Sequence, residues 1–153
     1  DLRQLDLEHY RNHVGMVTRV EFIEGTILEN LRVERSDIGL DTIDHVLSSI
    51  GLKHDIAKLS HGLDTPLTAF GAPLSTTQAQ RLMLARAIIG APDLLIIDGL
   101  LDTLNDEELK AVMRLLTDQS QQWMLIVTTR MPAIANQFAQ IITLDKADAG
   151  GAT

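Results

Sequence analysis

The feature that most constrains the fold is an apolar run over residues 94–97, Leu-Leu-Ile-Ile, that ends at Asp98. A strand with one face in water alternates apolar and polar residues, whereas a run that is apolar on both faces is typical of a buried strand in a parallel sheet. Residues 123–128 form a second such run, and residues 140–144 are a third candidate strand. The segments between them have helical character, and this alternation predicts a parallel α/β sheet with helices packed on it.

Two helices between the predicted strands have clear starting signals. Ser75 followed three residues later by Gln78 fits a capping box, which predicts a helix that continues to residue 89 and stops at the Gly-Ala-Pro of residues 90–92. Asn105 is a typical helix cap, and the three acidic residues that follow it suit the first turn of a helix. The apolar stripes of the two helices are Leu82, Ala85 and Ile89 in the first, and Leu109, Val112, Met113 and Leu116 in the second.

The N-terminal half is expected to hold shorter elements. These are a helix over residues 6–12, a strand over 14–18, one or two helical turns over 26–31 and a helix over 43–50. Asp41 resembles the cap of the last of these, and a further short helix runs to about residue 59. Residues 60–73 contain several Gly and Pro breaks and are expected to form a loop, while Pro132 suits the first turn of a late helix.

The composition narrows the classes of function. With 153 residues, 45 % of them hydrophobic, the chain suits one domain that buries roughly 70 % of its unfolded surface. The formal net charge of -8, without clustered Lys or Arg, argues against a nucleic-acid surface. The lack of cysteine excludes disulfides, thiolate metal sites and cysteine nucleophiles. No apolar run approaches the ~18 residues of a membrane-spanning helix, so the segment is expected to be soluble.

Polar residues at two strand ends mark the first candidate site, because ligands of open parallel sheets bind beyond the carboxyl ends of the strands. Asp98 could hold a hydrated Mg²⁺, a hard cation that prefers carboxylate and water, or it could simply end its strand and cap a turn. Thr128 and Thr129 end the second strand. The helix start at residues 74–78 could bind an anion through free backbone N–H groups, or could be an ordinary capped helix. The chain contains no Gly-x-x-x-x-Gly-Lys-[Ser/Thr] phosphate loop.

A family resemblance joins these segments. Residues 71–89 contain Leu-Ser-Thr-Thr-Gln, then Gln-Arg and Ala-Arg-Ala, and residues 92–98 run from a proline through an aliphatic strand to Asp98. This order resembles the nucleotide-binding domain of ABC transporters, whose pattern is Leu-Ser-Gly-Gly-Gln, Gln-Arg, Ala-Leu-Ala-Arg-Ala-Leu, a proline and a strand ending in Asp-Glu. Residues 1–17, 22–31, 125–130 and 141–146 resemble further segments of the exporters in that family, in order and over almost the whole chain.

The resemblance implies an α/β fold, the parallel sheet of a P-loop NTPase-like ABC ATPase domain with a helical subdomain. The helical subdomain would cover about residues 26–89 and the Walker B-side core about residues 90–146, within a single partial domain over residues 1–153. The domain would be truncated on its N-terminal side, with the P-loop half of the family domain lying before Asp1. In the family the P-loop strand lies between the strand at residues 123–128 and the last strand, so its loss would leave unpaired strand edges. We therefore expect the fragment to re-pair, swap a segment or self-associate.

Carried over position by position, the resemblance assigns nucleotide contacts to residues that depart from the family pattern. The glutamine that contacts Mg²⁺ falls at Arg19, or at Thr18 because of a one-residue difference in length. The signature motif becomes Ser75, Thr76, Thr77 and Gln78, with the two threonines in place of two glycines.

The catalytic positions also depart from the pattern. The Walker B aspartate is Asp98, but Gly99 stands where the family has the general-base glutamate, and Thr129 stands at the position of the switch histidine. The Ser-Ala-Leu-Asp loop of the family reads Asp-Thr-Leu-Asn, beginning at Asp102.

These departures predict a chain that neither binds ATP tightly nor hydrolyses it on its own. Gly99 has no side chain to orient the attacking water, and Thr129 cannot carry charge as an imidazole does. The β-branched side chains of Thr76 and Thr77 obstruct the close approach of a phosphate to the backbone. The resemblance therefore implies ATP and Mg²⁺ as cofactors of the intact family, with neither expected to be bound by this chain.

The leading interpretation is the C-terminal segment of a degenerate ABC ATP-binding domain that couples nucleotide-driven dimerisation to export. The partners would be a membrane domain and a second nucleotide-binding domain at the cytoplasmic face of the inner or plasma membrane. One alternative is a non-catalytic interaction or regulatory module that keeps the cassette shape. Another is an active ATPase with displaced residues, in which Asp102 stands in as the base.

Overall fold

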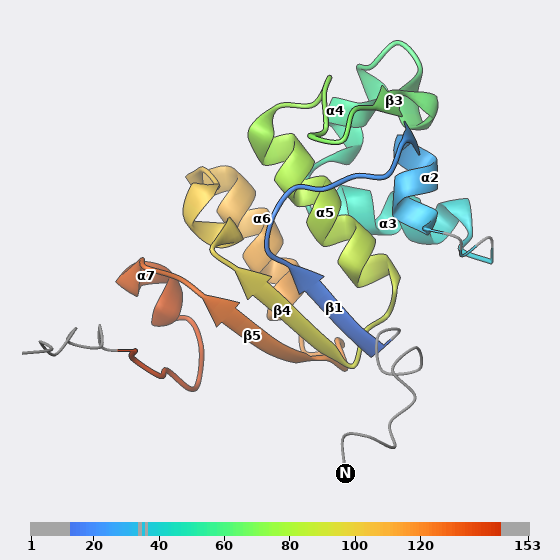
Figure 1. Cartoon of the computed structure of the whole chain (residues 1–153). Helices are drawn as coiled ribbons and strands as arrows, with labels where there is room; N and C mark the ends of the chain where they lie inside the picture. Colours follow the sequence, from blue (N-terminus) through green and yellow to red (C-terminus); the bar gives the residue numbers. More distant parts are fainter. Residues whose placement is uncertain (1–12, 34, 36, 145–153) are drawn as a thin grey trace, which may run out of the picture.

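A computed structural model describes residues 13–33, 35 and 37–144, so the helix expected over residues 6–12 lies outside the described residues. Figure 1 shows a small sheet with helices on one side, next to a group of shorter helices. The elements, in chain order, are β1 (Val14–Val17), β2 (Gly25–Thr26), α2 (Ile27–Arg32), α3 (Leu40–Ser49), α4 (Lys53–Ala57), the 3-10 helix η2 (Gly62–Asp64), β3 (Pro66–Leu67), α5 (Thr76–Ile89), β4 (Leu94–Asp98), the 3-10 helix η3 (Leu100–Thr103), α6 (Asp106–Leu116), β5 (Met124–Thr128) and α7 (Pro132–Ala135).

The predicted parallel sheet is confirmed. Its three strands lie in the order β1-β4-β5, with β4 hydrogen-bonded to a parallel neighbour on each side. The register places Val17 beside Ile97 and Ile97 beside Val127, so all three strands end at the same edge of the sheet, here called the carboxyl edge. Because β1 and β4 are far apart in sequence, the intervening chain must cross over, and it forms the helical group shown in Figure 1.

The two faces of the sheet differ in burial. On one face Val17, Leu95 and Ile97 are almost fully buried, and α5 packs against β1 on this side. On the other face Met16, Met124 and Ile126 are 56 %, 70 % and 51 % exposed. The expectation that residues 123–128 form a strand buried on both faces is therefore wrong, because the described residues cover only one face of the sheet.

The capping predictions for α5 and α6 are confirmed. Ser75 and Gln78 form the capping box of α5, and Asn105 caps α6, where Glu108 completes a second box. The predicted helix over residues 43–50 instead begins at Leu40, with Gly39 in the extended conformation at the cap and no side chain there to cap it. Asp41 lies in the first turn of α3, where its charge is favourable to the helix dipole.

Two other expectations are corrected. Residues 60–73 are not only a loop, since they contain η2 and the short strand β3, which pairs antiparallel with β2. The candidate strand over residues 140–144 is not formed, and Ile142 and Leu144 there are more than four-fifths exposed. A single strand is not stable without a neighbour that satisfies its backbone groups, and no described strand lies beyond β5 to supply one.

Candidate functional site

The carboxyl edge gathers the polar residues that follow the three strands. Thr18 and Arg19 follow β1, Asp98 ends β4 and Gly99 follows it, and Thr128 ends β5. Asp98 and Thr128, which end the two predicted strands, are directly paired in the parallel register of β4 and β5.

Asp98 is exposed, and its carboxylate accepts a hydrogen bond from the hydroxyl of Thr128. The backbone N–H of Gly99 lies 3.1 Å from the same hydroxyl oxygen, so the turn after β4 is tied to the end of β5. A small cavity of about 150 Å³ opens here, and Thr18, Arg19, Asp98 and Gly99 are among the residues that line it. The structure thus brings together the candidate magnesium ligand, the base position and both candidate glutamine positions.

These residues do not make up a magnesium site by themselves. Asp98 is the only carboxylate among the residues that line the small cavity, and the described part of the chain has no group of three or more His, Asp or Glu side chains that could hold a metal. Arg19 brings a cation to the cavity rather than an oxygen ligand, although its guanidinium is largely exposed and paired with Glu21 at 3.0 Å. Mg²⁺ prefers carboxylate oxygens and water, so no chemical step is assigned to a metal here.

Gly99 has a backbone conformation that favours glycine. Its φ is +66°, in the left-handed region, and a Cβ built on it would meet no other atom within 4 Å. A side chain at this position would therefore have room, but any residue other than glycine would cost roughly 1–2 kcal/mol in backbone strain. The position that the family resemblance assigns to the general base offers open space and no functional group.

Thr129 and Asp102 form a second pair near this edge. The Thr129 hydroxyl donates to one oxygen of the Asp102 carboxylate, and the backbone N–H of Arg130 donates to the other oxygen at 2.9 Å. The Thr129 oxygen in turn accepts the N–H of Met131 at 3.0 Å. These bonds join η3 to the segment after β5, and the side chains of Thr129 and Asp102 both take part in them.

The four signature residues, Ser75, Thr76, Thr77 and Gln78, lie at the start of α5 and line neither of the two cavities described here. The Gln78 N–H donates to the Ser75 hydroxyl at 3.3 Å, and the Ser75 N–H donates to the Gln78 side chain at 2.9 Å. The Thr77 hydroxyl donates to Glu108 of α6 at 3.1 Å. Three of the four candidate side chains are therefore engaged in structure, and the structure does not bring them into a common cavity with Asp98.

Arg81, one turn further along α5, is the residue that sequence analysis most clearly missed. Its side chain is 5 % exposed and uses all three of its nitrogens. One terminal nitrogen contacts Glu108 at 2.9 Å and Asp55 at 3.3 Å, and the other donates to the backbone carbonyl of Gly51 at 3.0 Å. Arg81 thereby ties α5 to α6 and to the α3–α4 turn. Its place beside the predicted apolar stripe of α5, next to Leu82 and one turn before Ala85, was the signal available in the sequence.

Asn30 is a second missed residue and holds the chain after β1. It is fully buried, its side-chain oxygen accepts the N–H of Ile23 at 2.9 Å, and its NH₂ group donates to the carbonyls of Ile23 and Thr26 at 3.0 Å. Thr26 caps α2 in a box with Glu29. This arrangement fixes one end of the segment that carries Thr18 and Arg19.

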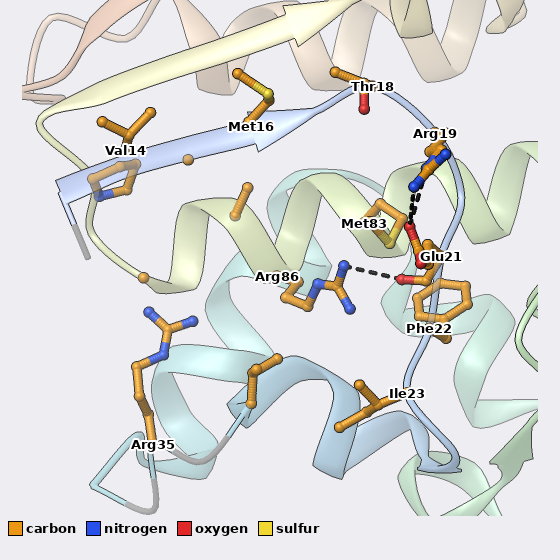
Figure 2. A pocket seen from close by; sticks show the side chains of 15 residues that line it. Val14, Met16, Thr18, Arg19, Glu21, Phe22, Ile23, Arg35, Met83 and Arg86 are labelled. Carbon is orange, nitrogen blue, oxygen red and sulfur yellow. Dashed lines mark hydrogen bonds and ion pairs between the residues drawn. The ribbon is translucent and has the colours of Figure 1, made fainter. Parts of the chain in front are cut away.

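The larger of the two cavities described here, about 680 Å³, lies between β1, α5 and the chain on either side of α2 (Figure 2). Arg86 of α5 donates to the backbone carbonyl of Glu21 at 3.0 Å and lies over the ring of Phe22. Burial lowers the pKa of the Arg86 guanidinium, the charge of Glu21 raises it, and the like charge of Arg35 lowers it further. This cavity, here called the basic cavity, shares Thr18 and Arg19 with the small one.

The family is decided by comparison with known proteins. The model of a protein family described as ABC transporter matches residues 1–101, which is more than half of the chain. This chain belongs to the ABC transporter family. The resemblance carried by the signature residues and by the strand ending at Asp98 is therefore confirmed.

Similar proteins include a P-glycoprotein, a multidrug efflux protein and an ABC exporter of known structure. P-glycoprotein 14 of Caenorhabditis elegans is 31 % identical over 95 % of this chain, and a multidrug efflux ATP-binding/permease protein of Mycobacterium bovis is 32 % identical over 95 %. This chain spans only 11 % and 12 % of the length of these two relatives. A bacterial Atm1-family ABC exporter, solved with ATP bound, has the same fold with a TM-score of 0.74 and 23 % identity, over 82 % of this chain and 23 % of that one.

The chain is thus part of an ABC transporter ATP-binding domain of the exporter type. The family normally binds ATP and Mg²⁺. None of the helices formed by residues 13–144 has the length and apolar character needed to cross a membrane.

Proposed function

We propose that this segment supplies the helical subdomain and the signature helix of an ABC exporter, and that its own hydrolytic site is inactive. The helical subdomain covers about residues 26–89 and the Walker B-side core about residues 90–146. The observation that carries the proposal is that Asp98 is followed by Gly99, at the position where the family has its general-base glutamate. Gly99 follows Asp98 into open space, so the residue at the base position has no side chain to orient a water molecule beside the Walker B aspartate.

The neighbouring residues support an inactive site. Asp102, the candidate for a displaced base, is held in a structural contact, since its two oxygens accept hydrogen bonds from the Thr129 hydroxyl and the Arg130 N–H. Thr129 is committed to the same contact. The Thr77 hydroxyl is held by Glu108, and Thr76 and Thr77 carry β-branched side chains where close approach to a phosphate calls for glycine.

In this proposal the segment acts through its partners. A membrane domain and a second nucleotide-binding domain, at the cytoplasmic face of the membrane, would use the helical subdomain and the signature helix as docking surfaces. On its own the chain self-associates, since β5 has a free edge and the apolar face with Met124 and Ile126 is open among the described residues.

Titration calorimetry of the chain with Mg-ATP tests the first part of the proposal. We expect no binding in the micromolar range and no release of phosphate above the buffer blank, and micromolar or tighter binding contradicts the proposal. The Asp98→Asn variant is the matched control, because it keeps the shape of the side chain and removes the only carboxylate lining the small cavity.

The complete gene separates the two non-catalytic interpretations. A Gly-rich phosphate loop and membrane helices encoded upstream of this segment support the exporter. A short gene with neither supports an interaction or regulatory module that retains the cassette shape. ATP turnover that falls when Asp102 is changed to Ala supports instead the active ATPase with a displaced base.

A further inference from the structure

The turn after β4 begins with Asp98 and Gly99, the only place in the sequence where an Asp or Asn precedes a Gly. The bond between these two residue types is chemically labile, because glycine has no Cβ to shield its backbone nitrogen from the neighbouring carboxyl group. Asp98 is exposed, and a Cβ built on Gly99 would meet no other atom within 4 Å. Burial therefore gives this peptide bond no protection.

The reaction open to this bond is the formation of a succinimide ring. The Gly99 nitrogen loses its proton and attacks Cγ of the uncharged Asp98 carboxyl group. A new N–C bond forms, and the C–O bond to the carboxyl hydroxyl breaks with the release of water. A water molecule then opens the ring at one of its two carbonyl carbons. Opening at Cγ restores aspartate, whereas opening at the main-chain carbonyl gives isoaspartate, in which the main chain runs through Cβ and Cγ.

The strand geometry of Asp98 opposes closure of this ring. Asp98 is the last residue of β4 and pairs with Thr128 of β5, which lies beside β4 in Figure 1. In an extended residue the next nitrogen lies along the strand, whereas Cβ points to one face of the sheet. The Gly99 nitrogen must therefore swing towards the Asp98 side chain, and the peptide plane between the two residues must rotate out of its pairing with β5.

Thr128 holds this peptide plane and the carboxylate at the same time. Its backbone carbonyl accepts the Gly99 N–H at 3.2 Å, and its hydroxyl oxygen lies 3.1 Å from the same nitrogen. The hydroxyl donates in turn to the Asp98 carboxylate. One residue thus binds both reacting groups, and rotation of the peptide plane breaks the two contacts of the nitrogen.

We propose that the bond between Asp98 and Gly99 is a site of spontaneous isoaspartate formation, and that the side chain of Thr128 protects it in the folded protein. The proposal goes beyond the proposed function and does not depend on it, since the reaction needs neither nucleotide nor partner. Isomerisation adds one methylene group to the main chain at the end of β4 and places the carboxylate on Cα. Both changes disrupt the pairing of Asp98 with Thr128, so a modified chain loses this part of the carboxyl edge.

The test follows isoaspartate in the full chain during incubation at neutral pH and physiological temperature. The product is labelled with a methyltransferase specific for isoaspartate and is located by fragmentation of the tryptic peptide over residues 87–110. The wild-type chain is compared in buffer and in urea, which removes the fold. We expect the reaction to be at least about tenfold slower in buffer, because ring closure in the folded chain breaks hydrogen bonds. Equal rates in buffer and urea overturn the proposal, as does a lack of isoaspartate in urea.

Variants assign the protection to the Thr128 hydroxyl. Thr128→Val keeps the β-branched shape without the hydroxyl, so the reaction should be about fivefold faster than in the wild type in buffer and unchanged in urea. Thr128→Ser keeps a hydroxyl and should retain most of the protection, and Thr128→Ala replaces Thr128→Val if the latter does not fold. A rate in buffer that is the same with and without the hydroxyl overturns the proposal.

Two controls complete the experiment. Thr129→Val removes the hydroxyl of the next residue, which bonds to Asp102, and should leave the rate at the wild-type value. If it accelerates the reaction as much as Thr128→Val, a general loss of stability explains the effect and the proposal is wrong. Asp98→Glu keeps a carboxylate but requires a larger ring, so it should abolish the signal. A signal of unchanged size in this variant comes from another residue and contradicts the assignment to Asp98.

Discussion

The hydroxyl of Thr129 donates a hydrogen bond to the carboxylate of Asp102, which links the 3-10 helix after β4 to the turn after β5. The two residues are 27 positions apart, and the bond ties together the two loops that follow neighbouring strands. Thr129 stands at the position that the family resemblance assigns to the switch histidine.

We predict an energetic coupling between these two residues. Asp102→Ala removes an acceptor of two hydrogen bonds and should lower the free energy of unfolding by about 1–3 kcal/mol. Thr129→Val should lower it by about 1 kcal/mol, and the double variant should lose less than the sum. Urea denaturation of the four proteins measures the coupling. Strict additivity would show that the two side chains act independently.

Arg81 should be among the most sensitive positions in the chain. Arg81→Met leaves Glu108 and Asp55 without their cation in a largely buried place, so the free energy of unfolding should fall by about 3–5 kcal/mol. Arg81→Lys keeps the charge but not the planar guanidinium group. Its free energy of unfolding should therefore lie between those of Arg81→Met and the wild type. Thermal unfolding followed by circular dichroism measures both.

Arg114→Met on the exposed side of α6 is the control for Arg81 and should change the stability by no more than about 0.5 kcal/mol. Equal losses at Arg81 and Arg114 would mean that the buried ion pairs contribute nothing specific.

The stability contribution of Glu29 should depend on pH. The backbone N–H and the hydroxyl of Thr26 hydrogen-bond the Glu29 carboxylate and lower its pKa. The ionised form is thus favoured in the folded state, so this contribution is present above the unfolded pKa of about 4.3 and is lost as the pH falls through the lower folded value. Glu29→Gln keeps a side chain that fits a capping box and removes the charge.

Urea denaturation from pH 6 to pH 3 should therefore show a weaker pH dependence for Glu29→Gln than for the wild type. Glu24→Gln, at an exposed glutamate in the preceding loop, controls for the loss of one negative charge. The interpretation fails if both variants flatten the pH dependence equally.

A capping side chain at the start of α3 should stabilise the protein. Gly39 has φ -70° and ψ 154°, close to the values of Ser75 and Asn105 at the caps of α5 and α6, but has no side chain to cap the helix. Gly39→Ser should raise the free energy of unfolding by about 0.5–1 kcal/mol, through a new cap and a less flexible unfolded chain. Gly39→Ala shares only the second effect, so it should be less stable than Gly39→Ser.

The open face of the sheet should drive self-association. Ile126 is half-exposed on β5, and Ile126→Lys puts a charge on this face next to the free edge, which disfavours pairing with another copy. We expect sedimentation to show oligomers of the wild-type chain at micromolar concentrations and a shift towards monomer in the variant. Leu40→Lys changes an equally exposed residue on α3 and should leave the oligomers intact. A wild-type chain that stays monomeric contradicts the prediction.

The fold could be predicted where local signals agreed with tertiary packing. The strand ending at Asp98 and the helices capped by Ser75 and Asn105 follow from short-range patterns that the structure keeps. The strand over residues 140–144 could not be judged this way, because a strand depends on a neighbour that its own sequence does not contain. The short strand β3 was missed because two residues with one proline carry no periodicity.

One part of the candidate site could be predicted in the same way, from local patterns that the structure keeps. The meeting of Asp98 and Thr128 follows from the parallel order of their strands, since strand ends of a parallel sheet share an edge. The contact of Asp102 with Thr129 depends on how two loops turn, and the ion pairs of Arg81 depend on which helices become neighbours. Neither is encoded in the spacing of residues along the chain.

Among the described residues no strand pairs with the outer edge of β5, so this molecule can accept a strand from a second polypeptide. A separate polypeptide that carries a parallel strand followed by an amphipathic helix could lie along β5 and cover Met124 and Ile126 at the same time. Joining fluorescent half-proteins to the two pieces would then report their reassembly in living cells, with the apolar face acting as the recognition surface.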